Sequence, residues 1–323
     1  MRWTTFAAAI SLACNSLQLD ALSSGATGTS DVKSSWVPRL IPSKIGANRL
    51  TQSYTETLFS KLFSSVPKRE FAIRDVSLDF GWQSSEDRNG LEGCNLGLTL
   101  LVGRSASGKS SLLRIVSGQE TPLYGTLTIN GQHIYNEKDS EQKSARPVII
   151  DSKPHCYDDQ FTVLDRIVKT SCKSLSLPKD ESMNILQDLA REFAITLGLT
   201  KKQLSGNPSQ LNPSGQYLFG LSCACMESSC SAVNLNMIED MQNQKEVEIS
   251  CPILLLDELM DAEHSDIAKS VGKGLLRLTA RGAIVIAATH RPQHFSGVAD
   301  RVVTLSSGKV LLQDFPNTRN VIE

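Results

Sequence analysis

One stretch of eight residues limits the fold of this chain more than any other, and it reads Gly103-Arg104-Ser105-Ala106-Ser107-Gly108-Lys109-Ser110. The apolar run 98–102 precedes it and is typical of a buried strand, while residues 111–116 follow with helical spacing. Its two glycines let the backbone curl so that consecutive N–H groups point at a phosphate, at the positive end of a helix. The stretch therefore predicts a phosphate-binding loop. The alternative is a turn that binds nothing.

Two side chains of this loop have expected roles toward a nucleotide. Lys109 would reach the β- and γ-phosphates, and the Ser110 hydroxyl would bind Mg²⁺. The loop backbone would surround the phosphates. The candidate nucleotide-binding residues are Gly103, Arg104, Ser105, Ala106, Ser107, Gly108, Lys109, Ser110 and Ser111.

Two later apolar strands end in groups that suit a phosphate-cleaving site. Residues 252–256 lead to Asp257-Glu258, and residues 283–288 lead to Thr289-His290. Asp257 would help hold Mg²⁺, directly or through water, and Glu258 would orient and polarise an attacking water. His290 would hydrogen-bond the γ-phosphate and sense its presence. The alternatives are a solvated strand end with two surface acids and a structural histidine.

The order of expected elements indicates an α/β fold with a largely parallel sheet, because strands alternate with helices. In such sheets ligands lie at the carboxyl ends of strands, where the loop, Asp257, Glu258 and His290 all fall. The other expected elements are strands at 70–80, 126–132 and 148–150, helices at 178–197 (ended by Gly198), from after Gln216 to about 226 and at 265–279, and a closing hairpin over 301–312.

Composition excludes several functional classes. The formal net charge of -1 argues against nucleic acid as the main partner. No apolar run reaches the roughly 18 to 20 residues needed to cross a bilayer, so membrane association requires a partner subunit. The eight cysteines are scattered, which suits a reducing compartment. Cys223, Cys225 and Cys230 lack a fourth ligand for a metal cluster, so we expect them to be small buried helix residues.

The first 68 residues have the composition of a targeting presequence. Residues 1–24 contain a short apolar run after Arg2, which is typical of a signal peptide, and a frayed amphipathic terminus is the alternative. Residues 25–68 are transit-like, since residues 21–69 hold two acids against seven Lys or Arg. This order resembles the two-part presequences of algae with complex plastids. We therefore expect a plastid, with a mitochondrion or the secretory route as alternatives, and a folded domain over 69–323.

Taken together, the motifs resemble the nucleotide-binding domain of ABC ATPases. The matching stretches are Gly103 to Ser110, Leu254 to Glu258, Ala287-Ala288-Thr289-His290, the spacing of Gly118 and Gly125, and Ala299 to Leu305 with Gly308-Lys309-Val310. The resemblance implies an α/β P-loop NTPase of ABC type, with a mostly parallel central sheet, an antiparallel β subdomain, and a helical subdomain at about 155–226 followed by an inserted loop at about 227–247. It implies ATP and Mg²⁺ as ligands, with Lys109, Glu258 and His290 as catalytic residues and Ser110 and Asp257 at the metal.

Several residues depart from the pattern that the resemblance implies. The signature loop of the family, usually Leu-Ser-Gly-Gly-Gln, reads here Asn212-Pro213-Ser214-Gly215-Gln216. In the family this loop caps the γ-phosphate bound by the opposing subunit. Pro213 removes both the usual hydroxyl and a backbone N–H, which Ser214 replaces imperfectly.

Three further departures lie elsewhere. A glutamine that links nucleotide and partner is replaced near Asp151, and the loop after Glu258, residues 259–264, differs from the usual Pro-Thr-Ser-Ala-Leu-Asp. Phe80 or Trp82 could stack on adenine, with core packing as the alternative for Phe80.

These departures favour an asymmetric dimer, because they affect the groups that act on a partner and spare those that act on this chain's own ATP. The partner would be another ABC ATPase subunit, in a homo- or heterodimer. The leading hypothesis for function is the ATP-hydrolysing subunit of a transporter with a separate membrane subunit. The alternatives are a soluble ABC ATPase of an assembly or scaffold complex, as in iron-sulfur cluster assembly, a low-turnover interaction module, and another P-loop enzyme such as a nucleotide kinase.

Overall fold

The protein is described by a computed structural model over most of its length after residue 37. The described residues are 38–53, 71–82, 95–135, 145–151, 160–174, 183–231, 233, 237, 240, 247–258, 265–295 and 297–316. The chain divides into two units, Met1–Ser35 and Trp36–Glu323, and every described residue belongs to the second. The expected signal-like segment therefore lies outside the described residues.

A six-stranded sheet forms the centre of the second unit, in the order β13-β12-β5-β11-β10-β8. All neighbouring pairs in it are parallel except β12 with β13, which form the predicted closing hairpin. The expected α/β fold with a mostly parallel sheet is confirmed. Its strands are β5 (Leu98–Val102), β8 (Val148–Ile150), β10 (Ile253–Asp257), β11 (Ile284–Thr289), β12 (Arg301–Ser306) and β13 (Lys309–Asp314).

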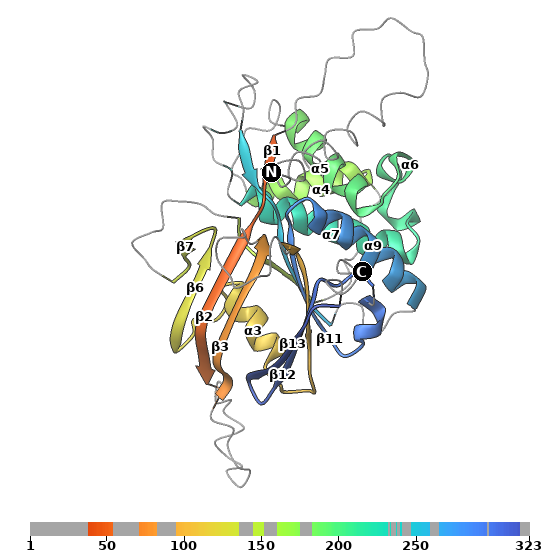
Figure 1. Ribbon diagram of the computed structural model, residues 1–323. Helices are drawn as coiled ribbons and strands as arrows, with labels where there is room; N and C mark the ends of the chain where they lie inside the picture. Colours follow the sequence, from red (N-terminus) through yellow and green to blue (C-terminus); the bar gives the residue numbers. More distant parts are fainter. Residues whose placement is uncertain are drawn as a thin grey trace, which may run out of the picture. The chain divides into compact units, whose positions relative to one another are not determined.

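Helices cover one face of this sheet and bury the larger of two hydrophobic cores against it (Figure 1). Leu98, Leu254 and Val285 point into this core from the sheet, because side chains alternate between the faces of a strand. The helices are α4 (Val163–Ser174), α5 (Met183–Leu197), α6 (Lys201–Leu204), α7 (Pro213–Cys230) and α9 (Ser265–Ala280), with short 3₁₀ turns at Pro208–Gln210 and Pro292–Phe295. Gly198 ends α5 as predicted, with a φ of 116° and an N–H that donates to Ala194 O.

The other face of the sheet packs on α3 (Lys109–Val116) and on a second, antiparallel sheet of order β4-β3-β2-β6-β7. Figure 1 shows β2, β3 and β6 side by side, with α3 next to them. Leu101, Leu112 and Phe80 meet in the smaller core between these layers. The strands of the second sheet are β2 (Lys44–Ser53), β3 (Phe71–Trp82), β4 (Asn95–Leu96), β6 (Tyr124–Ile129) and β7 (Gln132–His133). This sheet is the antiparallel subdomain that the family resemblance implies.

The predicted domain boundary at residue 69 is wrong. Strand β2 pairs with both β3 and β6, and its Ile45, Ala47 and Leu50 are almost fully buried. Composition concealed this strand, because residues 44–53 contain no acid and are as polar as a transit peptide. A register shift between Ala47 and Leu50 also breaks the alternation that identifies a strand.

Upstream of β2, residues 38–43 are also part of the fold. Strand β1 (Arg39–Ile41) pairs in parallel with β9 (Glu248–Ser250), and the Ser43 N–H donates to Gly282 O at 3.1 Å. Strand β9 follows the expected insertion at 227–247. That insertion begins later than predicted, because residues 227–230 form the last turn of α7.

Two of the three cysteines of α7, Cys225 and Cys230, are buried as predicted, whereas Cys223 is half-buried. Cys225 and Cys230 are fully buried, and among the described residues no group of three or more His, Cys, Asp or Glu side chains could hold a metal ion. Burial raises the pKa of the Cys225 thiol well above its ordinary value and that of Cys251 to about 12. Both thiols therefore stay protonated, and a protonated thiol is a poor metal ligand. No helix within the described ranges is long and apolar enough to span a bilayer.

Replacing Leu50 by alanine tests the role of β2 in the fold. Leu50 is completely buried, so Leu50→Ala should lower the free energy of unfolding by about 3 kcal/mol through lost burial and a cavity. Asn48→Ala on the exposed face of the same strand should change it by less than about 0.5 kcal/mol. Urea denaturation of the full chain measures both values. Equal stability of the two variants would contradict the place of β2 in the sheet.

Candidate functional site

The loop between β5 and α3 has the conformation that its two glycines permit. Gly103 and Gly108 have φ values of 156° and 105°, and a Cβ on Gly108 would lie 2.5 Å from Ala72 O. Ser107 N donates to Arg104 O at 3.1 Å and closes the turn. The loop therefore curls back over the start of α3, as the motif predicts.

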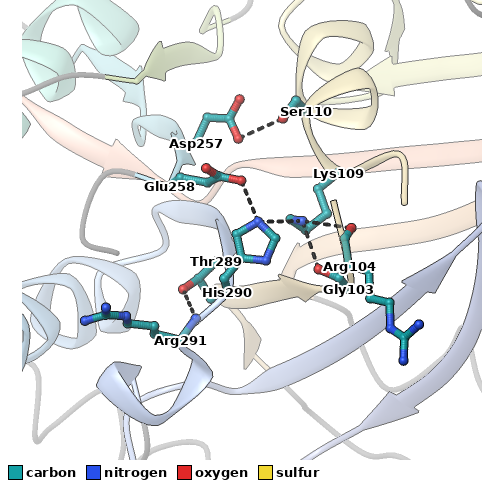
Figure 2. A network of polar contacts seen from close by, with 9 residues as sticks. All are labelled: Gly103, Arg104, Lys109, Ser110, Asp257, Glu258, Thr289, His290 and Arg291. Carbon is teal, nitrogen blue, oxygen red and sulfur yellow. Dashed lines mark hydrogen bonds and ion pairs between the residues drawn. The ribbon is translucent and has the colours of Figure 1, made fainter. Parts of the chain in front are cut away.

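Lys109, the first residue of α3, lies within the curl of this loop. Its side chain is buried, and its ammonium donates to Gly103 O at 3.0 Å and Arg104 O at 3.4 Å. Figure 2 shows the ammonium between these two carbonyls and the ring of His290. A cation held in this position would interact with the phosphates of a nucleotide that the loop surrounds.

Two polar pairs lie beside Lys109 at the carboxyl ends of β5, β10 and β11. Ser110 Oγ donates to Asp257 Oδ1 at 3.0 Å, and Glu258 Oε1 lies 2.8 Å from His290 Nε2 (Figure 2). Lys109, Ser110, Asp257, Glu258 and His290 are therefore brought together. The convergence follows from the parallel sheet, whose strands all end at one edge.

The contact with Glu258 fixes the proton on the histidine ring. A carboxylate only accepts hydrogen bonds, so Nε2 of His290 carries the hydrogen that it donates to Glu258. Lys109 Nζ lies 3.4 Å from the same nitrogen, and because both groups are then donors this contact is not a hydrogen bond. Glu258 and His290 thus form one pair, and Lys109 is held by the loop carbonyls.

Two residues of the site have backbone angles that L-amino acids rarely adopt. Ala106 has a φ of 58° and Glu258 a φ of 57°, in the left-handed region where a Cβ is unfavourable. The Glu258 N–H donates to Ala288 O at 3.0 Å, which ties this residue to the end of β11. Such strained positions concentrate at functional sites.

The residues present fit a phosphate group and a hard cation. The Ser107 hydroxyl is buried in the loop and has no hydrogen-bond partner among the described residues. The loop has no room for a Cβ at Gly103, where it would lie 2.6 Å from that hydroxyl. The Ser110 hydroxyl and Asp257 carboxylate supply oxygen atoms, which Mg²⁺ prefers.

The other residues predicted to bind the nucleotide lie in the phosphate-binding loop or directly after it. Arg104, Ser105 and Ala106 are exposed at the rim of the loop, and Ser111 lies in the first turn of α3. Phe80 is completely buried, and Cζ of Arg301 lies 4.9 Å from the centre of its ring. The alternative of core packing is therefore correct for Phe80, and stacking on adenine is not. The side chain of Trp82 and the loop 259–264 lie outside the described residues.

The predicted signature loop forms the amino end of the long helix α7. In the sequence it lies far from the phosphate-binding loop. Asn212 is the N-cap, and its Oδ1 accepts from Gly215 N at 2.8 Å and from Ser214 Oγ at 3.3 Å. Gln216 Nε2 donates to Leu211 O at 3.1 Å. The loop therefore uses its own polar groups to cap the helix.

Two residues that the sequence analysis names only as parts of motifs support the site through contacts that it did not assign. The buried Thr289 accepts the Arg291 N–H at 2.9 Å and so shapes the turn that carries His290. The Gly308 N–H, in the β12–β13 turn, donates to Ser107 O at 3.0 Å behind the phosphate-binding loop. The sequence features that could have indicated these contacts are the threonine before the histidine and the glycine in the closing hairpin.

Comparisons with known proteins agree with this geometry. Residues 96–229 match the model of the ABC transporter family. The chain is 27% identical over 242 residues to the sulfate/thiosulfate import ATP-binding protein CysA of Caulobacter vibrioides, covering 74% of this chain and 62% of that protein. It is also 27% identical over 220 residues to the glutamine transport ATP-binding protein GlnQ of Bacillus subtilis, covering 68% and 79%. The chain thus spans less than two thirds of the length of the first relative.

Solved structures give the same fold at lower identity. The dimeric structure of a bacterial ABC transporter cassette has a TM-score of 0.53 and 16% identity, over 84% of this chain and 99% of the other. The ADP conformation of an ATP-binding cassette has a TM-score of 0.56 and 17% identity, over 85% and 92%. At these identities the likeness concerns the fold alone.

Ala106→Gly tests the backbone strain in the loop. Glycine adopts a φ of 58° without penalty, so the variant should raise the free energy of unfolding by about 0.5 to 1 kcal/mol, despite the greater freedom of glycine in the unfolded chain. The control Ala280→Gly makes the same change at the exposed end of α9, where it should be destabilising. Urea denaturation compares the two. A loss of stability in both variants would contradict the strain.

Proposed function

Because the chain carries an ABC-type nucleotide-binding domain, we propose that it binds ATP with Mg²⁺ and hydrolyses it as a subunit of a transporter whose membrane part is a separate polypeptide. One observation carries the proposal: the Ser110–Asp257 and Glu258–His290 pairs lie beside Lys109 at one edge of the sheet. The names of the relatives, which are import and transport ATP-binding proteins, support a transporter over an assembly complex.

Binding of the nucleotide would use polar groups of the site that form hydrogen bonds with one another in the structure. The loop N–H groups and Lys109 would hold the phosphates, and Lys109 would exchange the carbonyls of Gly103 and Arg104 for phosphate oxygens. Ser110 and Asp257 would hold Mg²⁺ between them, directly or through water. The metal, when bound, neutralises charge on the β- and γ-phosphate oxygens.

Hydrolysis would depend on Glu258 and His290. The Glu258 carboxylate is half exposed, so a water can reach it, and it would orient that water and take its proton. His290 already holds the carboxylate through Nε2–H, and the same N–H can instead donate to a phosphate oxygen. This exchange would let His290 report whether the γ-phosphate is present.

The partner in this proposal is another ABC ATPase subunit with an intact Leu-Ser-Gly-Gly-Gln loop. In the loop of this chain, Pro213 has no N–H, and the Gly215 N–H is occupied by the Asn212 side chain. Few donors remain there for a phosphate held by a second subunit. We therefore expect an asymmetric dimer in which this chain's own ATP site is the active one.

A plastid location is a further proposal, supported by the composition of the N-terminal residues. Strands β1 and β2 limit a removable transit segment to residues before Pro38. Fusion of residues 1–37 to a fluorescent protein tests the location, and import into another compartment would contradict it.

Glu258→Gln tests the catalytic role within the proposed function. The amide cannot take a proton from water, so turnover should fall at least about a hundredfold while ATP affinity stays within about threefold. Glu227→Gln, an exposed acid in the last turn of α7, is the matched control and should be neutral. Phosphate release and equilibrium ATP binding measure the two effects in the presence of a partner subunit. Unchanged turnover would contradict the assigned role.

Pro213→Ser tests the asymmetric dimer. A chain with both Pro213→Ser and Glu258→Gln offers a restored loop but cannot hydrolyse ATP. Adding it to the wild-type chain should raise turnover about tenfold, because it completes the wild-type site with the missing donors. Adding a chain with Glu258→Gln alone is the control, and it should not raise the turnover. Strong turnover by the wild-type chain alone, unaffected by Pro213→Ser, would contradict the asymmetry.

A further inference from the structure

The turn between β12 and β13 lies directly behind the phosphate-binding loop. It has two central residues, Ser307 and Gly308, because Ser306 pairs with Lys309. Their φ values of 48° and 76° are typical of a type I′ hairpin turn. The Gly308 N–H donates to Ser107 O at 3.0 Å, so this turn reaches the loop through one backbone hydrogen bond.

Strand β3 holds the turn in place from the other side. The Arg74 N–H donates to Gly308 O at 2.8 Å. A Cβ on Gly308 would lie 2.7 Å from Ala72 O and 3.1 Å from Ile73 Cα, and both are backbone atoms of β3. The turn therefore fills a narrow space between β3 and the loop, in which residue 308 has no room for a side chain.

The hydrogen bond from Gly308 sets the orientation of the peptide group between Ser107 and Gly108. All peptide bonds in the described part of the chain are trans, and the C=O and N–H of a trans peptide point in opposite directions. Because the Ser107 C=O points back at Gly308, the Gly108 N–H points to the inside of the loop. It donates to no residue that the structure describes, so it is available to a phosphate oxygen.

The opposite orientation of this peptide group would disfavour a phosphate. Glycine at residue 108 allows it, because glycine accepts φ values of either sign. The Ser107 C=O would then point into the loop, and a carbonyl oxygen can only accept hydrogen bonds. It would repel a phosphate oxygen at the place where the Gly108 N–H now offers a donor.

We propose that Gly308 is a positioning residue for nucleotide binding, which keeps the Gly108 N–H directed at the phosphates. The inference rests on the proposed function, since it concerns the same loop. A phosphate bound to the Gly108 N–H and the contact between Gly308 and Ser107 favour the same orientation, so each stabilises the other. Loss of the contact weakens nucleotide binding, and nucleotide binding protects the Gly308 N–H from exchange with water.

The first experiment makes the same substitution in two turns of the same type. In the β6–β7 turn Asn130 and Gly131 have φ values of 50° and 82°, but a Cβ on Gly131 would meet no atom within 4 Å. Gly308→Ala and Gly131→Ala therefore add similar backbone strain, and only Gly308→Ala forces its turn away from its neighbours. Binding of a fluorescent ATP analogue with Mg²⁺ to the full chain should weaken about tenfold in Gly308→Ala and less than about twofold in Gly131→Ala.

The second experiment uses the unaltered chain and so does not depend on the folding of a variant. Amide hydrogen exchange is followed by NMR with and without Mg²⁺ and a non-hydrolysable ATP analogue. Exchange of the Gly308 N–H should slow by at least about threefold when the nucleotide is bound. The Asn130 N–H, which donates to Lys44 O at 2.8 Å in the control turn, should exchange at an unchanged rate.

The outcomes separate this inference from the proposed function. If the wild type binds ATP but its Gly308 exchange rate does not respond to the nucleotide, the positioning role is overturned and the proposed function stands. The role is also overturned if folded Gly308→Ala binds ATP within twofold of the wild type, or if Gly131→Ala loses as much affinity, because strain alone would then explain the loss.

Two further results complete the test. If Gly308→Ala does not fold, the exchange rates of the unaltered chain decide. If the wild type binds no ATP, the proposed function fails and the inference fails with it. A selective loss of affinity in Gly308→Ala, together with slower exchange of the Gly308 N–H in the unaltered chain, supports the proposal.

Discussion

The phosphate-binding loop keeps its shape because three backbone segments meet behind it with no space for side chains. A Cβ on Gly108 would lie 2.5 Å from Ala72 O, and a Cβ on Gly308 would lie 2.7 Å from the same oxygen. Gly308 also donates to Ser107 O and accepts from Arg74 N. The loop thus joins β3 of the antiparallel sheet to the β12–β13 turn of the central sheet, so the geometry of the site depends on the packing of both.

This dependence explains why β2, which contributes no residue to the candidate site, matters for the geometry of that site. Strand β2 lies between β3 and β6, and β3 supplies the Ala72 carbonyl behind the loop. Sequence reasoning found β3 and β5 because their apolar patterns are regular. It missed β2 because the register shift between Ala47 and Leu50 breaks the regular alternation of the strand. Within this irregular part Arg49 has a φ of 52°, and its side chain forms an ion pair with Asp75, whose φ is 53°, on the partner strand.

The residues of the candidate site could be predicted because they follow from local rules. A glycine-rich loop before a helix predicts Lys109 and Ser110, and parallel strands that end at one edge bring in Asp257, Glu258 and His290. Contacts between distant segments could not be predicted in this way. The stacking of Arg301 on Phe80 and the support from Gly308 depend on which segments pack together, and no local pattern reports that.

The amino ends of α3 and α7 differ in whether their polar groups have hydrogen-bond partners. At α3, the loop holds a buried hydroxyl on Ser107 without a hydrogen-bond partner among the described residues, a state that burial makes unfavourable and a phosphate would relieve. At α7, Asn212 caps the helix and Pro213 removes a donor, so the helix satisfies its own end. One amino end is therefore built to receive an anion, while the other is already satisfied. A second subunit with an unsatisfied loop of its own would supply what α7 does not.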